Sequence, residues 1–213
     1  MFKLIHKDES PFSMAAFGYS MLYPFTDNYI DSSLHLPDEK QAYNRLIRSK
    51  ISGEAVKPAT RHEKKTCRLL SAIESEYPRS SNNEIYQLLL MMLDAQELSI
   101  KQQNTSPLLS EEERLDISLY KGGVSVLIDR YLVKKALTED EIIVYLGLGF
   151  FLQLADDLQD IGEDSSLGYQ TLLTINTTRG ANEKTVNKLL NFIHEILTPF
   201  KPDNELVKDF VLD

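Results

Sequence analysis

Apolar residues recur along most of the chain at intervals of three and four, a spacing that places them on one face of an α-helix. Leu88, Met91, Met92 and Ala95 are one example. Runs rich in Gly, Pro, Ser and Asn separate these segments, and patterns typical of β-strands are nearly absent. The pattern therefore predicts an all-α protein, with helices near residues 12–31, 38–51, 61–77, 83–103, 110–135, 139–163, 183–198 and 203–211.

Three of the predicted helices begin with the pattern Ser/Thr-x-x-Glu. In this capping box, the hydroxyl and the carboxylate each accept a hydrogen bond from a backbone N–H that has no partner inside the helix. The three pairs are Ser81 with Glu84, Ser110 with Glu113, and Thr138 with Glu141.

Composition narrows the class of protein. With 213 residues, 42% of them hydrophobic, the chain can bury one sizeable core, and we expect a single domain over 1–213. The net charge of −9 argues against a nucleic-acid partner. Cys67 is the only cysteine, which excludes an internal disulfide.

The longest uncharged apolar run, Ile142 to Ala155, is 14 residues long and falls short of the roughly 20 needed to cross a bilayer. We expect a soluble, cytoplasmic chain without a transmembrane segment.

An acidic cluster directly follows this apolar run. The stretch FLQLADDLQDIGED, from Phe151 to Asp164, contains five acidic residues. Gln153, Asp156 and Asp160 share one face of a helix, and Asp164 extends the row if the helix continues. Like charges at this spacing destabilise a helix by a few tenths of a kcal/mol per pair, and they also oppose the negative helix C-terminus. The cluster is either a solvated helix end or a binding site for a cation.

A second acidic pair favours a cation-binding site over a solvated helix end. In LYPFTDNYIDSS, Asp27 and Asp31 are four residues apart, again at the end of an aromatic-rich helix. Two such helices that face each other across an apolar cavity would hold divalent cations between them, and with these cations a diphosphate. Mg²⁺ suits the residues because it prefers oxygen ligands and combines one or two carboxylates with substrate phosphates.

These motifs resemble those of the class I isoprenoid (terpenoid) synthase superfamily. Residues 149–160 fit the pattern G-x-x-F/L-Q-x-x-D-D-x-x-D of trans-prenyl diphosphate synthases, and LQLADDLQDIGED is equally similar to the LQxTNxxRDxxED segment of squalene and phytoene synthases. LYPFTDNYID resembles the first aspartate-rich motif of either branch, although Asn28 replaces the second Asp of DDxxD. Lys121, with Gly122 and Gly123, looks like the basic, small-residue segment that faces the cavity in these enzymes.

The resemblance implies a helical bundle around a central apolar cavity, here expected to lack some N-terminal helices. It also implies an Mg²⁺-dependent transferase that ionises the carbon–diphosphate bond of an allylic prenyl diphosphate. Lys121 would contact the diphosphate and would act in catalysis together with Asp156 and Asp160. The implied metal ligands are Asp27, Asp31, Asp156, Asp157, Asp160 and Asp164. The oligomeric state remains open, with a homodimer as the candidate, because a short chain would gain from covering apolar surface.

Several assignments have alternatives. Gln153 is expected to bind substrate, and Gln96 and Ser99 either meet the diphosphate or form an ordinary polar helix face. Elongation, head-to-head coupling and cyclisation remain open. The short chain and the absence of paired arginines after Asp31 favour a second hypothesis, in which a catalytically silent homologue binds an isoprenoid or a partner helix. An all-α nucleotide pyrophosphohydrolase ranks last, because its Glu-x-x-Glu helix motifs are not visible.

Overall fold

The computed structural model describes residues 13–103, 106–174 and 179–198, and within these ranges every regular element is a helix. The all-α prediction is therefore confirmed. The α-helices are α2 (Met14–Asp31), α3 (Pro37–Ile51), α4 (Arg61–Glu76), α5 (Asn83–Ser99), α6 (Glu111–Lys134), α7 (Glu139–Gln159), α8 (Ile161–Leu167) and α9 (Arg179–Leu197). A short 3₁₀ helix, η1 (Ile100–Gln103), follows α5. None of the helices in the described ranges is long and apolar enough to cross a membrane.

Most predicted helices agree with the observed ones to within a few residues. Two are divided: the segment 83–103 is α5 followed by η1, and the segment 139–163 is α7 followed by α8. At Asp160, between α7 and α8, the backbone angles φ −96° and ψ 6° depart from α-helical values. Asp164 therefore lies on the separate helix α8 and not on a further turn of α7. The predicted helix 203–211 falls outside the described residues.

Capping decides where several helices begin. The capping boxes predicted for α6 and α7 are confirmed. The box predicted from Ser81 and Glu84 is wrong, because Asn82 is the N-cap residue of α5 and makes no side-chain capping bond. α4 begins with a further capping box that the prediction missed.

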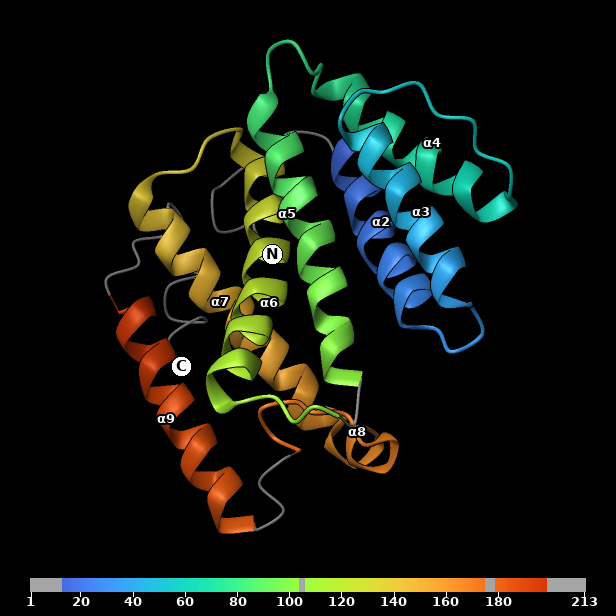
Figure 1. Cartoon of the computed structure of the whole chain (residues 1–213). Helices are drawn as coiled ribbons and strands as arrows, with labels where there is room; N and C mark the ends of the chain where they lie inside the picture. Colours follow the sequence, from blue (N-terminus) through green and yellow to red (C-terminus); the bar gives the residue numbers. More distant parts are fainter. Residues whose placement is uncertain (1–12, 104–105, 175–178, 199–213) are drawn as a thin grey trace.

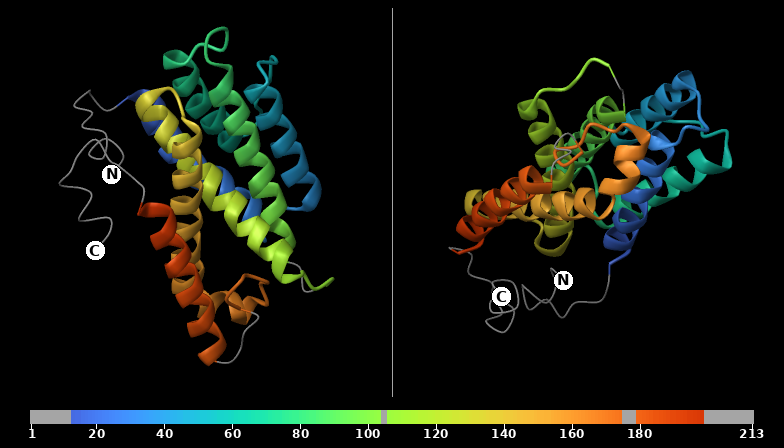
Figure 2. Two further views of the ribbon diagram at one scale, coloured as in Figure 1. Left: turned by 90° about the vertical axis from the view of Figure 1, so that its left-hand side faces the viewer. Right: turned by 90° about the horizontal axis from the view of Figure 1, so that it is seen from below.

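The helices form a bundle with α6 near its centre. α6 packs against both α5 and α7, while α2 packs against α4 on one flank and α9 packs against α7 on the other (Figure 1). The two turned views in Figure 2 also place α9 beside α7, far from α2, α3 and α4. The largest group of buried apolar residues belongs to α2–α6, and Tyr19, Leu22, Ile73 and Leu89 are among them.

Glycines allow α6 and α7 to cross closely. A Cβ atom built on Gly122 would overlap the carbonyl oxygen of Gly149, and one built on Gly149 would overlap the carbonyl oxygen of Gly122. A Cβ on Gly123 would lie 2.6 Å from Cδ2 of Leu146. Only residues without a side chain allow these backbones to approach so closely, and the approach fixes the position of Lys121 relative to Gln153.

The C-terminal ends of α2, α5 and α7 point toward the same end of the bundle, where α8 also lies (Figure 1). Helix C-termini carry partial negative charge, and both acidic motifs stand at such ends. This end of the molecule is therefore strongly negative and favours a cation.

His62 on α4 is enclosed by aromatic rings. Its ring stacks on Phe25, with centroids 3.9 Å apart and planes 9° apart, and the ring of Tyr29 lies 4.4 Å away. Burial lowers the pKa of His62, and the charge of His35 lowers it further. The Nε2 atom is buried without a hydrogen-bond partner, so protonation would place an unsatisfied cation there.

We expect the contribution of His62 to the free energy of unfolding to fall as the pH drops from about 7.5 to 5.5. A folded-state pKa below the unfolded value means that the unfolded chain binds more protons in this range, so stability is present above the unfolded pKa of about 6.5 and is lost below it. Urea denaturation of wild type and of His62→Phe at both pH values measures the contribution of His62. The phenylalanine variant lacks this contribution, so on going from pH 7.5 to 5.5 it should lose less stability than wild type, or gain more. His194→Asn, at an exposed position, should keep the wild-type slope. Equal slopes in wild type and His62→Phe would contradict the prediction.

Candidate functional site

All six aspartates chosen from the sequence line one cavity of about 190 Å³, which we call the polar cavity. They come from the end of α2, from the end of α7 with the residue that follows it, and from α8. The six residues are Asp27, Asp31, Asp156, Asp157, Asp160 and Asp164. Helix packing thus brings together two motifs that are about 125 residues apart in sequence.

Lys121 of α6 lies between the first acidic motif, with Asp27 and Asp31, and the second, with the aspartates from 156 to 164. It pairs with the first motif. Its Nζ atom is 3.1 Å from Oδ2 of Asp27 and 3.8 Å from Oδ2 of Asp31. Burial disfavours the ammonium, but the charges of Asp27 and Asp31 outweigh this effect and raise the pKa of Lys121. Lys121 is therefore charged at neutral pH and is the counterion of the first motif. Asp31 also accepts a hydrogen bond from Nε2 of Gln103, at 2.9 Å.

Two buried carboxylate oxygens in the cavity have no hydrogen-bond partner. They are Oδ1 of Asp27 and Oδ2 of Asp157. Burial raises the pKa of Asp27, an effect that Lys121 opposes. Burial raises the pKa of Asp157 to about 6, although Oδ1 of this residue accepts a 2.9 Å hydrogen bond from Gln153. Such oxygens are costly to bury unless a partner binds them.

The remaining carboxylates of the second motif repel one another. Burial raises the pKa of Asp156, and the charge of Asp160 raises it further. Burial likewise raises the pKa of Asp164, and the charges of Asp160 and Asp156 raise it further. A bound cation would relieve this repulsion.

The donor set fits Mg²⁺ held jointly with a phosphate. Among the described residues, no group of three or more Asp, Glu, His or Cys side chains is arranged to hold a metal ion by itself. Mg²⁺, however, typically uses one or two carboxylates and takes its other ligands from phosphate and water. The unpartnered oxygens of Asp27 and Asp157 and the mutual repulsion around Asp156 are compatible with such a shared site. Asp27 and Asp31 from one side, and Asp156 and Asp160 from the other, would hold the ions.

Gln153, Gln96 and Ser99 have different positions. Gln153 lines the polar cavity, and its role in substrate binding stays a prediction. Ser99 also lines it, but its hydroxyl donates to the carbonyl of Gln96. Gln96 is fully buried and is not part of the wall: its Oε1 accepts from Thr26 and its Nε2 donates to the carbonyl of Tyr23. We correct its assignment from a substrate ligand to a bridge that holds α5 against α2, because its amide is occupied by these bonds.

A second cavity of about 430 Å³, the inner cavity, continues from the polar cavity between α2, α6 and α7. The two cavities share Asp27, Lys121, Gln153 and Asp156. Beyond these shared residues, the inner cavity is lined by Tyr19, Tyr23, Val126, Asp129 and Leu152, among others. Its walls thus combine aromatic and aliphatic surface with a carboxylate, Asp129, that the sequence analysis did not select.

Most aromatics near the motifs pack elsewhere. Of the five aromatic residues Tyr23, Phe25, Tyr145, Phe150 and Phe151, which stand near the two motifs in sequence, only Tyr23 lines the inner cavity. Tyr145 and Phe150 are fully buried in separate apolar groups, Phe151 packs toward α9, and Phe25 stacks on His62.

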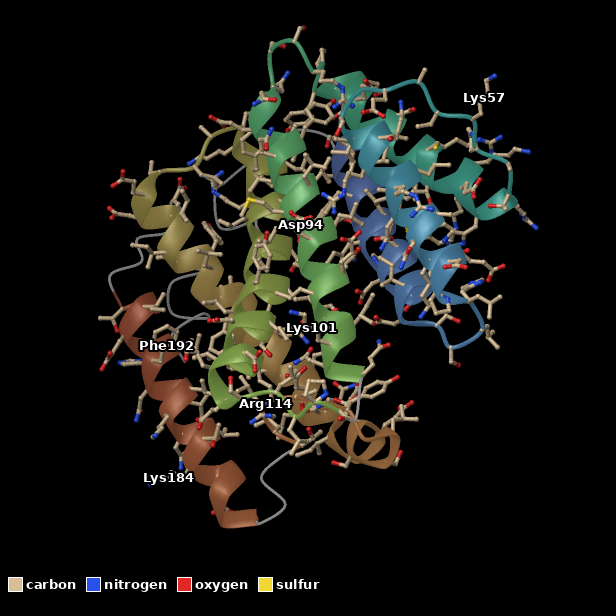
Figure 3. The ribbon with its side chains drawn as sticks, in the orientation of Figure 1. Lys57, Asp94, Lys101, Arg114, Lys184 and Phe192 are labelled. Atoms are coloured by element: carbon tan, nitrogen blue, oxygen red, sulfur yellow. The ribbon has the colours of Figure 1, made fainter. Side chains whose placement is uncertain are left out.

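Basic residues are scarce at the site. Of the Lys and Arg side chains in the described part of the chain, Lys121 is the only one in the walls of the two cavities. Arg48 pairs with Asp94 and Glu97, and Arg130 is buried and pairs with Glu141. Figure 3 labels Lys101 and Arg114 at the end of the bundle near α8, but neither lines the polar or the inner cavity, and Arg114 donates to the carbonyl of Leu109. A diphosphate bound here would depend on metal ions for most of its charge neutralisation.

Sequence reasoning missed several polar residues of the cavity. Gln102 and Gln103 of η1 line it, as do Tyr169 and Thr171 in the segment after α8. Gln170 holds this segment, because its backbone N–H donates to the carbonyl of Gln102 and its side chain bridges to Leu109. The Gly168-Tyr169 sequence after the second motif marked a turn, but nothing in it indicated which side chain faces the cavity.

Comparison of this chain with family models, with curated proteins and with solved structures found no match. The functional assignment therefore depends on the geometry of the two cavities.

Proposed function

We propose that the protein binds an allylic prenyl diphosphate together with Mg²⁺ and ionises its carbon–diphosphate bond, as expected of a class I isoprenoid synthase. The observation that supports this proposal is the meeting of both acidic motifs and Lys121 in a single polar cavity that opens into a partly apolar one. A diphosphate fits the first cavity and a prenyl chain the second.

The residues have complementary roles in this proposal. Bound Mg²⁺ would supply positive charge where the leaving diphosphate becomes more negative. Asp27, Asp31, Asp156 and Asp160 would hold these ions. Lys121 moves from the carboxylates of Asp27 and Asp31 to the diphosphate oxygens when the ligand enters.

This exchange predicts synergy between metal and diphosphate. Without a ligand, Lys121 neutralises the first motif, so Mg²⁺ alone binds weakly. The diphosphate draws Lys121 away and brings its own oxygen ligands, so each ligand increases the affinity of the other.

The proposal is tested by isothermal titration with an unreactive thio-analogue of farnesyl diphosphate, with and without Mg²⁺. We expect binding only when Mg²⁺ is present, and we expect Asp27→Ala to abolish it by removing a carboxylate that pairs with Lys121 and that would hold the metal. Asp38→Ala, at an exposed position of α3, is the control and should bind like wild type. Absence of binding to the wild type under any condition would refute the proposed function.

A second candidate function is binding without catalysis, in which a silent homologue holds an isoprenoid or a partner helix. The scarcity of Lys and Arg side chains around the cavities favours it, because a diphosphate site ordinarily has several cationic contacts. Binding of the analogue without release of diphosphate from the reactive substrate would identify this second function.

A further inference from the structure

Asp129 stands apart from the two acidic motifs. It lines the inner cavity but not the polar cavity. On α6 it follows Lys121 by eight residues, with Ser125 between them, so the three lie along one face of the helix. Eight residues correspond to about 12 Å along the axis, which separates Asp129 from the diphosphate end by the length of a short prenyl chain.

The surroundings of Asp129 suit a cationic intermediate. Tyr19 and Tyr23, with ring centroids 6.3 Å apart, lie on the facing helix α2, and both line the cavity. The hydroxyl of Tyr19 donates to the backbone carbonyl of Ser125, at 3.0 Å, one turn before Asp129. Burial and then the charge of Asp129 raise the pKa of Tyr19, so this phenol stays neutral. The π faces of aromatic rings attract positive charge, and the carboxylate adds a full negative charge at the far end.

We propose that Asp129 is the proton acceptor that ends the reaction, so that the product is an olefinic hydrocarbon formed from a short prenyl chain. This inference rests on the proposed function, which supplies the carbocation. The C–O bond to the diphosphate breaks, and its electron pair leaves with the diphosphate. The distal C=C bond of the chain then gives its electron pair to the allylic cation, so that a C–C bond forms and the cationic carbon comes to lie at the far end of the cavity. A C–H bond next to that carbon breaks, its electron pair forms a new C=C bond, and the proton moves to the carboxylate of Asp129.

The acid–base properties of Asp129 agree with this role. Burial raises its pKa to about 6. The carboxylate is thus ionised at neutral pH but is more basic than an exposed aspartate, and a general base is most effective when its pKa is close to the working pH. Asp27 and Asp156 lie at the diphosphate end of the cavity and are committed to Lys121 and the metal ions.

The test compares wild type, Asp129→Asn and Asp129→Glu with geranyl and farnesyl diphosphate in the presence of Mg²⁺. Hydrocarbon and alcohol products are measured by gas chromatography with mass spectrometry, and circular dichroism checks that each variant folds. We expect Asp129→Asn to lower hydrocarbon formation by roughly 10²-fold and to raise the alcohol fraction, because water then captures the cation. Asp129→Glu retains a carboxylate and should recover part of the hydrocarbon. Asp116→Asn, an exposed position on the same helix, should leave the products unchanged.

The outcomes separate this inference from the proposed function. A folded Asp129→Asn that makes hydrocarbon at the wild-type rate would overturn the role of Asp129 and leave the proposed function intact. A wild type that binds the thio-analogue with Mg²⁺ and releases diphosphate from the reactive substrate, but forms no hydrocarbon, would also overturn the inference alone. A wild type that does not bind the analogue would refute the proposed function and the inference with it.

Discussion

Asp156→Ala is expected to reduce Mg²⁺-dependent release of diphosphate from geranyl or farnesyl diphosphate by roughly 10²- to 10³-fold. Losses of this size follow the removal of one group that stabilises developing charge in a reaction. Asp156 lines both cavities, so in the proposed function it would stand where the diphosphate joins the prenyl chain. The release of inorganic diphosphate, followed by a coupled colorimetric assay, measures the effect.

The matched control is Asp140→Asn, which removes a carboxylate from the exposed first turn of the same helix. It should release diphosphate at the wild-type rate. If Asp156→Ala also retained the wild-type rate, Asp156 would have no part in holding the metal. Analogue binding that persists in Asp156→Ala at unchanged affinity would lead to the same conclusion.

Gly149→Ala is expected to destabilise the protein by about 3 kcal/mol or more, at the upper end of the usual cost of overpacking. The new Cβ would overlap the carbonyl oxygen of Gly122 and would lie 2.8 Å from the Cα of Gly123. These are backbone atoms, so no rotation of a side chain relieves the overlap, and α6 and α7 must move apart. Urea denaturation, monitored by circular dichroism, measures the loss.

Gly162→Ala provides the comparison, because nothing lies within 4 Å of a Cβ built at that position in α8. There the gain in helix propensity should leave stability unchanged or raise it by less than about 1 kcal/mol. Equal stabilities for the two alanine variants would show that the close helix crossing contributes nothing. Separation of α6 from α7 should also displace Lys121 from Gln153, so Gly149→Ala should weaken binding of the thio-analogue.

The sequence predicted the helices well because periodicity and capping are local. The spacing of apolar residues depends on 3.6 residues per turn, and the Thr138–Glu141 box is complete within four residues. Two local predictions were wrong. Asn82, next to Ser81, is the N-cap residue of α5, and the backbone leaves the α-helical conformation at Asp160, where a continuous helix was predicted.

The acidic side of the site was also visible in the sequence. Like charges at helix ends are unfavourable without a partner, so Asp27, Asp31 and the aspartates from 156 to 164 stood out by chemistry alone. The structure brings all six into the polar cavity. Lys121 was selected only through a weak resemblance, and its pairing with Asp27 gives that choice a physical basis.

Tertiary structure decided which neighbouring residues belong to the site. Gln96 and Ser99 looked equivalent on a helix, yet Gln96 bonds to Thr26 and Tyr23 across the α2–α5 contact while Ser99 lines the cavity. Asp129 carried no signal, because one acidic residue on a long helix is ordinary until α2 and α7 enclose it.

The sequence by itself thus determined the helical fold class, most helix positions and the acidic character of one end of the molecule, since each follows from residues within a few turns of one another. Only the tertiary structure decided that the two motifs face one cavity, that Lys121 neutralises the first of them, and that Gly122 and Gly149 set the distance between α6 and α7. These features depend on contacts between residues far apart in the chain, and such contacts arise only when the apolar helix faces pack together.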